Sequence, residues 1–283
     1  MKRLIRGILS DATYHASRLA NGTSGGLRIL MYHRVTDAHP HERLCVPVAQ
    51  WEAQMRDLRD EGYRSLSLAD AVRWIERGGA LPPKSVVITF DDGYVDNFHY
   101  AAATMARYGL TGMFFIPTAR LDGPTRGSHP DDASMSWAQL AELLAQGHEI
   151  GAHSVTHRKL TLIDPAQRAR EVRECKQALE QRLQRSVEFF CYPAGAYDGL
   201  VKQAVRDSGY RGACTVEPGA NRPWMDVFAL KRTEISAVDS LWDVRKKLAG
   251  AYDWLHVAAQ AVYRMSPRSR QQPSNALMGD ADV

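Results

Sequence analysis

Short apolar segments alternate with segments of helical periodicity along most of this sequence. The apolar segments, at about residues 27–33, 65–68, 85–90, 112–117, 148–153, 187–192 and 211–216, have the length and composition of buried strands. The helical segments lie at about residues 48–62, 69–77, 97–108, 136–146, 165–184 and 199–208. Such alternation is typical of a parallel α/β fold, because parallel neighbours need a crossover connection. Since no linker interrupts the pattern between Gly26 and about Ser236, we expect one catalytic domain.

The composition excludes several classes of protein. An apolar fraction of 45% and a charged fraction of 24% suit a folded domain rather than a disordered chain. The formal net charge is +4, and the basic residues are dispersed rather than grouped with aromatic residues, so we expect no nucleic-acid partner. Four scattered cysteines, with no Cys-x-x-Cys pair, are typical of reduced thiols.

The two ends of the chain differ from its centre. Arg6 and Asp11 interrupt the first apolar stretch, so the sequence predicts no secretory signal and a cytoplasmic protein, with the inner membrane surface as an alternative location. We expect an amphipathic helix and a Gly-rich joint over 1–25, the catalytic domain over 26–238, an amphipathic helix over 239–264 and a disordered tail over 265–283. Either terminal helix could pack on the domain or make peripheral membrane contact.

The strand over 85–90 ends in two adjacent carboxylates, Asp91 and Asp92, followed by Gly93. Folding does not require two like charges at the end of a buried strand, and their repulsion should raise one pKa. A bound cation would relieve that repulsion. The pair therefore predicts a metal site, unless the two side chains only cap the helix that follows.

Two histidines provide further candidate ligands. His153 and His157 follow another predicted strand, in the pattern His-x-x-x-His. Two imidazoles and one carboxylate, with coordination positions left open, are typical of a catalytic metal. The spacing alone is common on surfaces, so the prediction depends on combining it with the Asp91–Asp92 pair.

These segments resemble the motifs of the NodB-type polysaccharide deacetylases, carbohydrate esterase family 4. The first two motifs are similar to residues 89–94 (TFDDGY) and 153–157 (HSVTH). Residues 30–35 (LMYHRV) and 190–198 (FCYPAGAYD) resemble the branch that deacetylates poly-N-acetylglucosamine exopolysaccharides. The resemblance covers roughly residues 27–235. It implies a distorted (β/α)7 barrel that hydrolyses N-acetyl groups of a glycan or its precursor and releases acetate.

The resemblance also implies a role for each site residue. Asp92, His153 and His157 would hold a divalent ion, with zinc favoured over cobalt, nickel or iron. Asp91 would be the general base that activates water, and His33 would protonate the departing amine. A backbone N–H within the segment formed by Tyr192, Pro193 and Ala194 would stabilise the oxyanion. The alternatives stay open for His33, as a histidine of the core, and for the segment 192–195, as a tight strand exit.

The sequence departs from the family pattern at two places. Many members carry an arginine in the third motif that pairs with the base, but Phe189, Phe190 and Cys191 occupy that neighbourhood here. We expect another cation, for which Arg232 is the candidate, to orient Asp91. Ala194 stands where many members have an aromatic residue, which implies a reduced sugar-stacking surface.

Three functions are compatible with these residues. The first is a hydrolase of non-peptide C–N bonds that deacetylates N-acetylated glycans. The second is a hydrolase of cyclic amides or imides with the same barrel, and the third is an inactive carbohydrate-binding barrel. The intact set of Asp91, Asp92, His153, His157 and His33 favours the first.

Overall fold

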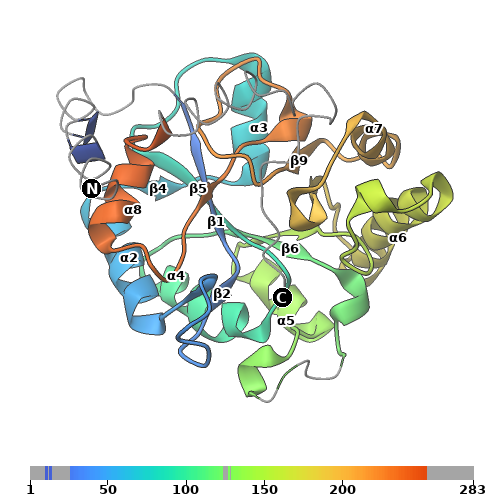
Figure 1. Cartoon of the computed structure of the whole chain (residues 1–283), viewed down its shortest axis with the longest axis horizontal. Helices are drawn as coiled ribbons and strands as arrows, with labels where there is room; N and C mark the ends of the chain where they lie inside the picture. The colour runs from blue at the N-terminus through green and yellow to red at the C-terminus, as the bar shows by residue number, and fades with distance from the viewer. Residues whose placement is uncertain (1–9, 12, 15–25, 124–126, 128, 254–283) are drawn as a thin grey trace, which may run out of the picture.

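A parallel sheet forms the centre of the structure, a computed structural model that describes residues 10–11, 13–14, 26–123, 127 and 129–253 (Figure 1). The sheet has eight strands in the order β10-β1-β5-β6-β7-β8-β9, with β4 beside β5. The strands are β1 (Arg28–Tyr32), β4 (Arg64–Ser65), β5 (Ser85–Phe90), β6 (Met113–Ile116), β7 (Glu149–Ala152), β8 (Phe189–Cys191), β9 (Gly212–Cys214) and β10 (Thr233–Glu234). Their pairings are parallel, which confirms the predicted α/β class.

Helices surround this sheet in Figure 1, with α3 at the top, α2 and α8 on the left and α6 and α7 on the right. Their bounds are α2 (Val48–Asp60), α3 (Leu68–Arg77), α4 (Ala103–Arg107), α5 (Trp137–Ala145), α6 (Pro165–Leu183), α7 (Gly199–Asp207) and α8 (Leu241–Leu248). The sheet curls, so that the chain leaving β9 reaches β1. Leu230 forms a bridge with Cys214 of β9, and Thr233 pairs with Leu30 of β1. This arrangement is the predicted distorted (β/α) barrel.

Side-chain caps begin several of the helices. The Ser67 side chain accepts a hydrogen bond from the Asp70 N–H and begins α3. Ser136 begins α5 in the same way, and the Gln139 side-chain oxygen accepts a hydrogen bond from the Ser136 N–H. A hydroxyl at this position satisfies a backbone donor that has no partner inside the helix.

Alternating residues of the strands point to opposite faces of the sheet. On β5, Val86, Ile88 and Phe90 belong to the large apolar cluster that includes residues of α2, α4, α6 and α7. Val87 belongs to a second cluster with residues of β8, β9 and α3. Asp91 follows Phe90 directly and therefore continues the face of Val87, towards the second cluster.

Two local structures were not predicted. The strands β2 (Arg34–Val35) and β3 (Cys45–Val46) form a separate two-stranded parallel sheet directly after β1. A π-helical turn spans Asn97–Ala102 before α4. Such turns are often found at functional sites, and this one begins five residues after Asp92.

The C-terminal helix is shorter than predicted. The sequence pattern favoured one helix over 239–264, but α8 ends at Leu248. Gly250 adopts a φ of 75°, and the N–H groups of Gly250 and Ala251 bond to the carbonyls of Lys247 and Lys246. This left-handed glycine terminates the helix. Residues 254–264 and the predicted tail over 265–283 lie outside the described residues.

A short part of the N-terminal segment packs on α8. Within the predicted helix over 1–25, the structure describes Ser10, Asp11, Thr13 and Tyr14. The Thr13 hydroxyl donates to the carbonyl of Ala251 at 3.1 Å, and the Tyr14 ring lies edge-on to Trp242 at 4.5 Å. In the described parts of the chain, none of the helices combines the length and apolarity needed to cross a membrane.

Candidate active site

The predicted site residues follow the carboxyl ends of neighbouring strands. His33 comes directly after β1, Asp91 and Asp92 after β5, and His153 after β7. Because the strands are parallel, these ends meet at one end of the barrel. The backbone there is strained: φ is 73° at Asp92, 62° at Ser154 and 63° at His157. Non-glycine residues adopt this region rarely and cluster at functional sites.

Asp92, His153 and His157 converge on one point. The Oδ1 atom of Asp92 lies 3.0 Å from Nε2 of His157 and 3.8 Å from Nε2 of His153. One ligand atom from each of the three lies within 4.8 Å of the others. One carboxylate and two imidazoles fit a divalent ion such as zinc, which takes nitrogen and oxygen ligands.

Neighbouring groups orient the two histidines of this set. His153 Nδ1 lies 2.8 Å from the carbonyl of Cys191, which leaves Nε2 facing Asp92. Such a bond from the second nitrogen is typical of metal-binding histidines. The Glu171 carboxylate of α6 accepts from the N–H groups of Val155 and Thr156 and so holds the loop between the two histidines.

Burial and the neighbouring charges favour an ionised Asp92 beside a neutral His153. Burial raises the pKa of Asp92, but the hydrogen bond and charge of His157 outweigh burial and lower it well below its usual range. Burial, followed by the charge of His157, lowers the pKa of His153 to about 4. A neutral histidine and an ionised aspartate are the forms that bind metal ions.

Asp91 forms a buried ion pair with Arg232. Both side chains are buried, and two parallel hydrogen bonds of 2.7 Å join the guanidinium to the two carboxylate oxygens. Arg232 also donates to the carbonyl of Thr215 and to the hydroxyl of Thr89. Burial raises the pKa of Asp91, but Arg232 dominates, with help from His153 and His33, and lowers it to about 2. The structure thus places the predicted cation against the predicted base.

A second group of metal-ligating side chains overlaps the first. Asp91, His153 and Cys191 also lie within 4.8 Å of one another. However, Arg232 Nη2 lies 3.1 Å from Cys191 Sγ, so a permanent positive charge already occupies this group. Burial raises the pKa of the Cys191 thiol well above its usual value, so the thiol stays protonated. The set of Asp92, His153 and His157 is therefore the better ion site.

His33 lies close to the candidate base, at the end of the neighbouring strand β1. Its Nε2 atom lies 4.0 Å from Asp91 Oδ2. The carbonyl of His33 accepts a hydrogen bond of 2.9 Å from the Asn97 side chain. This geometry places the His33 ring next to the candidate base.

The turn after β8 contains the three residues predicted to supply the oxyanion donor, and only some of them have a backbone N–H that is available. The N–H of Tyr192 bonds to the carbonyl of Cys214 within the sheet, and the Tyr192 hydroxyl bonds to the carbonyl of Phe228. Pro193 has no N–H. Ala194 is exposed with a φ of 52°, and its N–H has no hydrogen-bond partner among the described residues. Of the three predicted residues, Ala194 therefore has the available donor.

Sequence reasoning missed several groups at this end of the barrel. Glu171 holds the histidine loop, Asn97 contacts His33, and Arg120 Nη1 lies 3.4 Å from Asp92 Oδ1. Asp96 and Arg34 form a buried ion pair beside them. Arg34 directly follows His33 in the quoted segment 30–35, but nothing in the local sequence indicates its partner.

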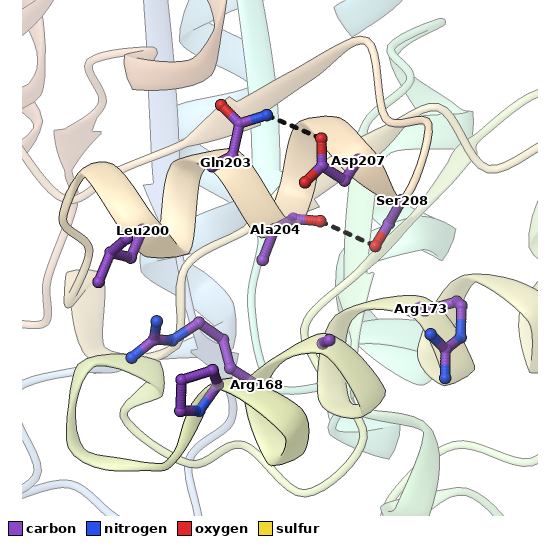
Figure 2. Close-up of a pocket in the computed structure, with 9 residues that line it drawn as sticks. Arg168, Arg173, Leu200, Gln203, Ala204, Asp207 and Ser208 are labelled. Carbon is purple, nitrogen blue, oxygen red and sulfur yellow. Dashed lines mark hydrogen bonds between the residues drawn. The ribbon is translucent and has the colours of Figure 1, made fainter.

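A surface groove lies apart from the site. Figure 2 shows it between α6 and α7, with Arg168 and Arg173 on one helix and Leu200, Gln203 and Asp207 on the other. None of the residues that line it belongs to the site described above.

Comparison with known proteins identifies the family. The family model named polysaccharide deacetylase matches residues 78–213. YxkH of Bacillus subtilis (strain 168), whose full name is "Putative polysaccharide deacetylase YxkH", is 30% identical over 210 residues, which span 74% of this chain and 71% of that protein. The chain belongs to the polysaccharide deacetylase family.

Solved structures of deacetylases share the fold. The Streptococcus pyogenes deacetylase PplD, in complex with acetate, has a TM-score of 0.72 at 23% identity and covers 80% of this chain and 99% of its own. IcaB from Ammonifex degensii has a TM-score of 0.69 at 23% identity over 79% of this chain and 97% of its own. A poly-beta-1,6-N-acetyl-D-glucosamine N-deacetylase of Escherichia coli (strain K12) is 39% identical over 71 residues, 24% of this chain and 10% of that protein.

Proposed function

We propose that this polysaccharide deacetylase family member removes N-acetyl groups from amino sugars of a glycan or its precursor by ion-dependent hydrolysis. The observation that carries the proposal is the position of Asp91. Its carboxylate is fixed by Arg232 at 2.7 Å and lies beside the Asp92, His153 and His157 set, with His33 4.0 Å away. A candidate base, a candidate acid and a candidate ion site thus lie next to one another.

Each residue has a chemical task in this proposal. Asp92, His153 and His157 would hold the ion, and zinc suits this donor set, with cobalt, nickel and iron as alternatives. A bound divalent ion makes water more acidic and polarises a carbonyl oxygen. Asp91 takes the proton from the attacking water, because its low pKa keeps it ionised.

The departing nitrogen requires the second proton transfer. An amine leaves poorly as an anion, so His33 donates a proton to it as the C–N bond breaks. The Ala194 N–H stabilises the negative charge that develops on the carbonyl oxygen. The products are acetate and a free amino sugar.

The name of one relative supports a substrate class for this proposal. The Escherichia coli relative acts, by its name, on poly-beta-1,6-N-acetyl-D-glucosamine, although the similarity covers a small part of both chains. We therefore favour a β-linked N-acetylglucosamine substrate for this chain.

The test measures acetate release from N-acetylated oligosaccharides of different linkage. The protein is freed of metal ions with a chelator and then restored with zinc, cobalt, nickel or iron. We expect release only after restoration, and more from β-1,6-linked N-acetylglucosamine than from chitin oligomers. Absence of release with every ion and glycan would favour the inactive carbohydrate-binding alternative. Ring opening of cyclic amides or imides, with no acetate released from any glycan, would favour the cyclic amide hydrolase.

A further inference from the structure

The ring of His33 has few contacts that could orient it. Its Nδ1 atom is buried, and no hydrogen-bond acceptor reaches it from the described part of the chain. The nearest charged group to Nε2 is Asp91 at 4.0 Å, which is too long for a hydrogen bond. The position of the ring therefore depends on how the backbone of His33 is held.

That backbone is held by two neighbouring residues of the loop after β5. The Asn97 side chain donates to the His33 carbonyl at 2.9 Å. Oδ1 of Asp96 accepts from the N–H of Val35 at 3.1 Å. The chain on both sides of Arg34 is thus attached to the segment that begins with Asp91 and Asp92.

Arg34 strengthens this attachment with its side chain. Its Nε donates to Asp96 Oδ2 at 2.8 Å, and its Nη1 and Nη2 donate to Asp132 Oδ1 and to the carbonyl of Asp131, each at 2.9 Å. The guanidinium also lies 4.4 Å from the centre of the Tyr94 ring. Arg34 is 7% exposed and Asp96 is fully buried, so water competes little for these bonds.

Further bonds fix the partners of Arg34. The N–H of Val95 donates to the carbonyl of Ala133, and the N–H of Met135 donates to the carbonyl of Gly93, each at 2.9 Å. On Asp132, Oδ1 lies 2.6 Å from His39 Nε2, and Oδ2 accepts from the His129 N–H. Three loops are therefore joined by one buried network that contains no predicted catalytic side chain.

From these contacts we infer that Asp96, with Arg34 and Asn97, positions His33 relative to Asp91 for protonation of the leaving amine. The inference rests on the proposed function, because it assigns a task to groups that act through its acid. Asp96 is suited to the task since each of its oxygens has a separate partner, one on the backbone and one on the side chain. It lies on the same loop as the base, so it fixes the distance between acid and base.

Two substrates distinguish a role of Asp96 in positioning His33 from a role in stabilising the fold. An N-acetylated sugar has an amine leaving group and needs the acid, whereas 4-nitrophenyl acetate has a stable phenolate leaving group and does not. We expect Asp96→Asn to lower kcat for the sugar by ~10–100-fold with KM unchanged, because small misplacements of a catalytic group have effects of that size. Hydrolysis of 4-nitrophenyl acetate should change less than about twofold.

Two further variants keep the test decisive. Asn97→Ala removes the contact with the His33 carbonyl and should give the same selective loss, so it replaces Asp96→Asn if that variant does not fold. Asp253→Asn is the matched control, because it breaks the contacts of Arg28 with Asp253 at the opposite end of β1. Both activities of Asp253→Asn should equal those of the wild type.

A double variant tests whether Asp96 acts through His33. In a His33→Ala background, Asp96→Asn should cause no further loss on the sugar, because residues that act as a unit are not additive. Equal losses on both substrates, or losses that multiply in the double variant, would overturn the inference. If the wild type cleaves only the ester and no N-acetyl group, the proposed function fails instead, so the two failures are distinct.

Discussion

The two ends of the barrel sheet use buried polar residues in different ways. At the carboxyl ends, Asp92, Ser154 and His157 have strained backbones, and the ligand atoms of Asp92 and the two histidines face one another. At the amino ends, polar side chains are paired with backbone groups. Glu149 accepts from the Leu68 N–H at 2.6 Å, and Asn221 both donates to and accepts from Lys231. Because Lys84, at the amino end of β5, also has a left-handed φ of 55°, the converging ligand atoms rather than backbone strain distinguish the carboxyl ends.

The histidines that flank β7 show the difference most directly. His148 precedes the strand and His153 follows it, both are buried, and the pKa of each is lowered to about 4. Burial is the cause for His148, whose Nδ1 accepts from the Gly112 N–H at 3.1 Å. His153 instead directs Nε2 towards Asp92. Burial and a low pKa are thus shared, and the neighbouring carboxylate distinguishes the proposed ion ligand from the other histidine.

The largest effect is expected when this contrast is tested by substitution. His153→Ala should lose the bound ion and reduce acetate release by ~10⁴-fold, because the ion supplies several kcal/mol of transition-state stabilisation. His148→Asn should keep both, since the Asn oxygen can accept from Gly112 in place of Nδ1. Ion content by mass spectrometry and acetate release measure the two outcomes. Ion loss in His148→Asn, or its retention in His153→Ala, would contradict the assignment.

A somewhat smaller effect is expected at the base. Asp91→Asn removes the proton acceptor but none of the three ion ligands, so it should retain the ion and lose ~10³-fold in acetate release. Ion content and kcat are measured on the same preparation. Full activity in Asp91→Asn would show that another group is the base.

Substitutions of Arg232 test the importance of its buried ion pair with Asp91. Arg232→Met leaves the buried Asp91 carboxylate without its partner and should lower the free energy of unfolding by about 3–5 kcal/mol. Arg232→Lys keeps the charge but cannot make two parallel hydrogen bonds, so it should be more stable than Arg232→Met and still less active than the wild type. Urea denaturation and acetate release measure these outcomes. Equal stability of wild type and Arg232→Met would contradict the importance of the pair.

Much of the fold was predictable because its signals are local. Apolar strands, helical periodicity and the caps at Ser67 and Ser136 each occupy a few neighbouring residues. Strands β4 and β10 have two residues each, and β10, too short for a pattern, was missed. The glycine at position 250 that ends α8 was present in the sequence, but the apolar spacing continued past it and favoured a longer helix.

The site was predictable where its motifs are contiguous and not where contacts are distant. Asp91–Asp92 and His153–His157 stand in short segments, whereas Arg34 lies 62 positions before Asp96 and 98 before Asp132. The Arg232 partnership was inferred from the missing arginine of the third motif, not from any feature of residues 230–232. Buried networks of this kind depend on the folded chain, and no local rule indicates them.

The smallest expected effect concerns pH and the amino end of the sheet. His148 has a folded pKa of about 4 against an ordinary value of 6.5. Between these values the unfolded chain binds a proton that the folded chain does not, so stability should fall as the pH decreases from about 6.5 to about 4. The contribution is at most ~3 kcal/mol. Urea denaturation of the ion-free wild type and of ion-free His148→Asn, at pH 7 and at pH 5, measures the contribution of His148. The contribution of His153 is present in both proteins and therefore cancels in the comparison. The loss on acidification should be smaller in His148→Asn, and an equal loss would show that His148 does not distinguish the folded from the unfolded chain.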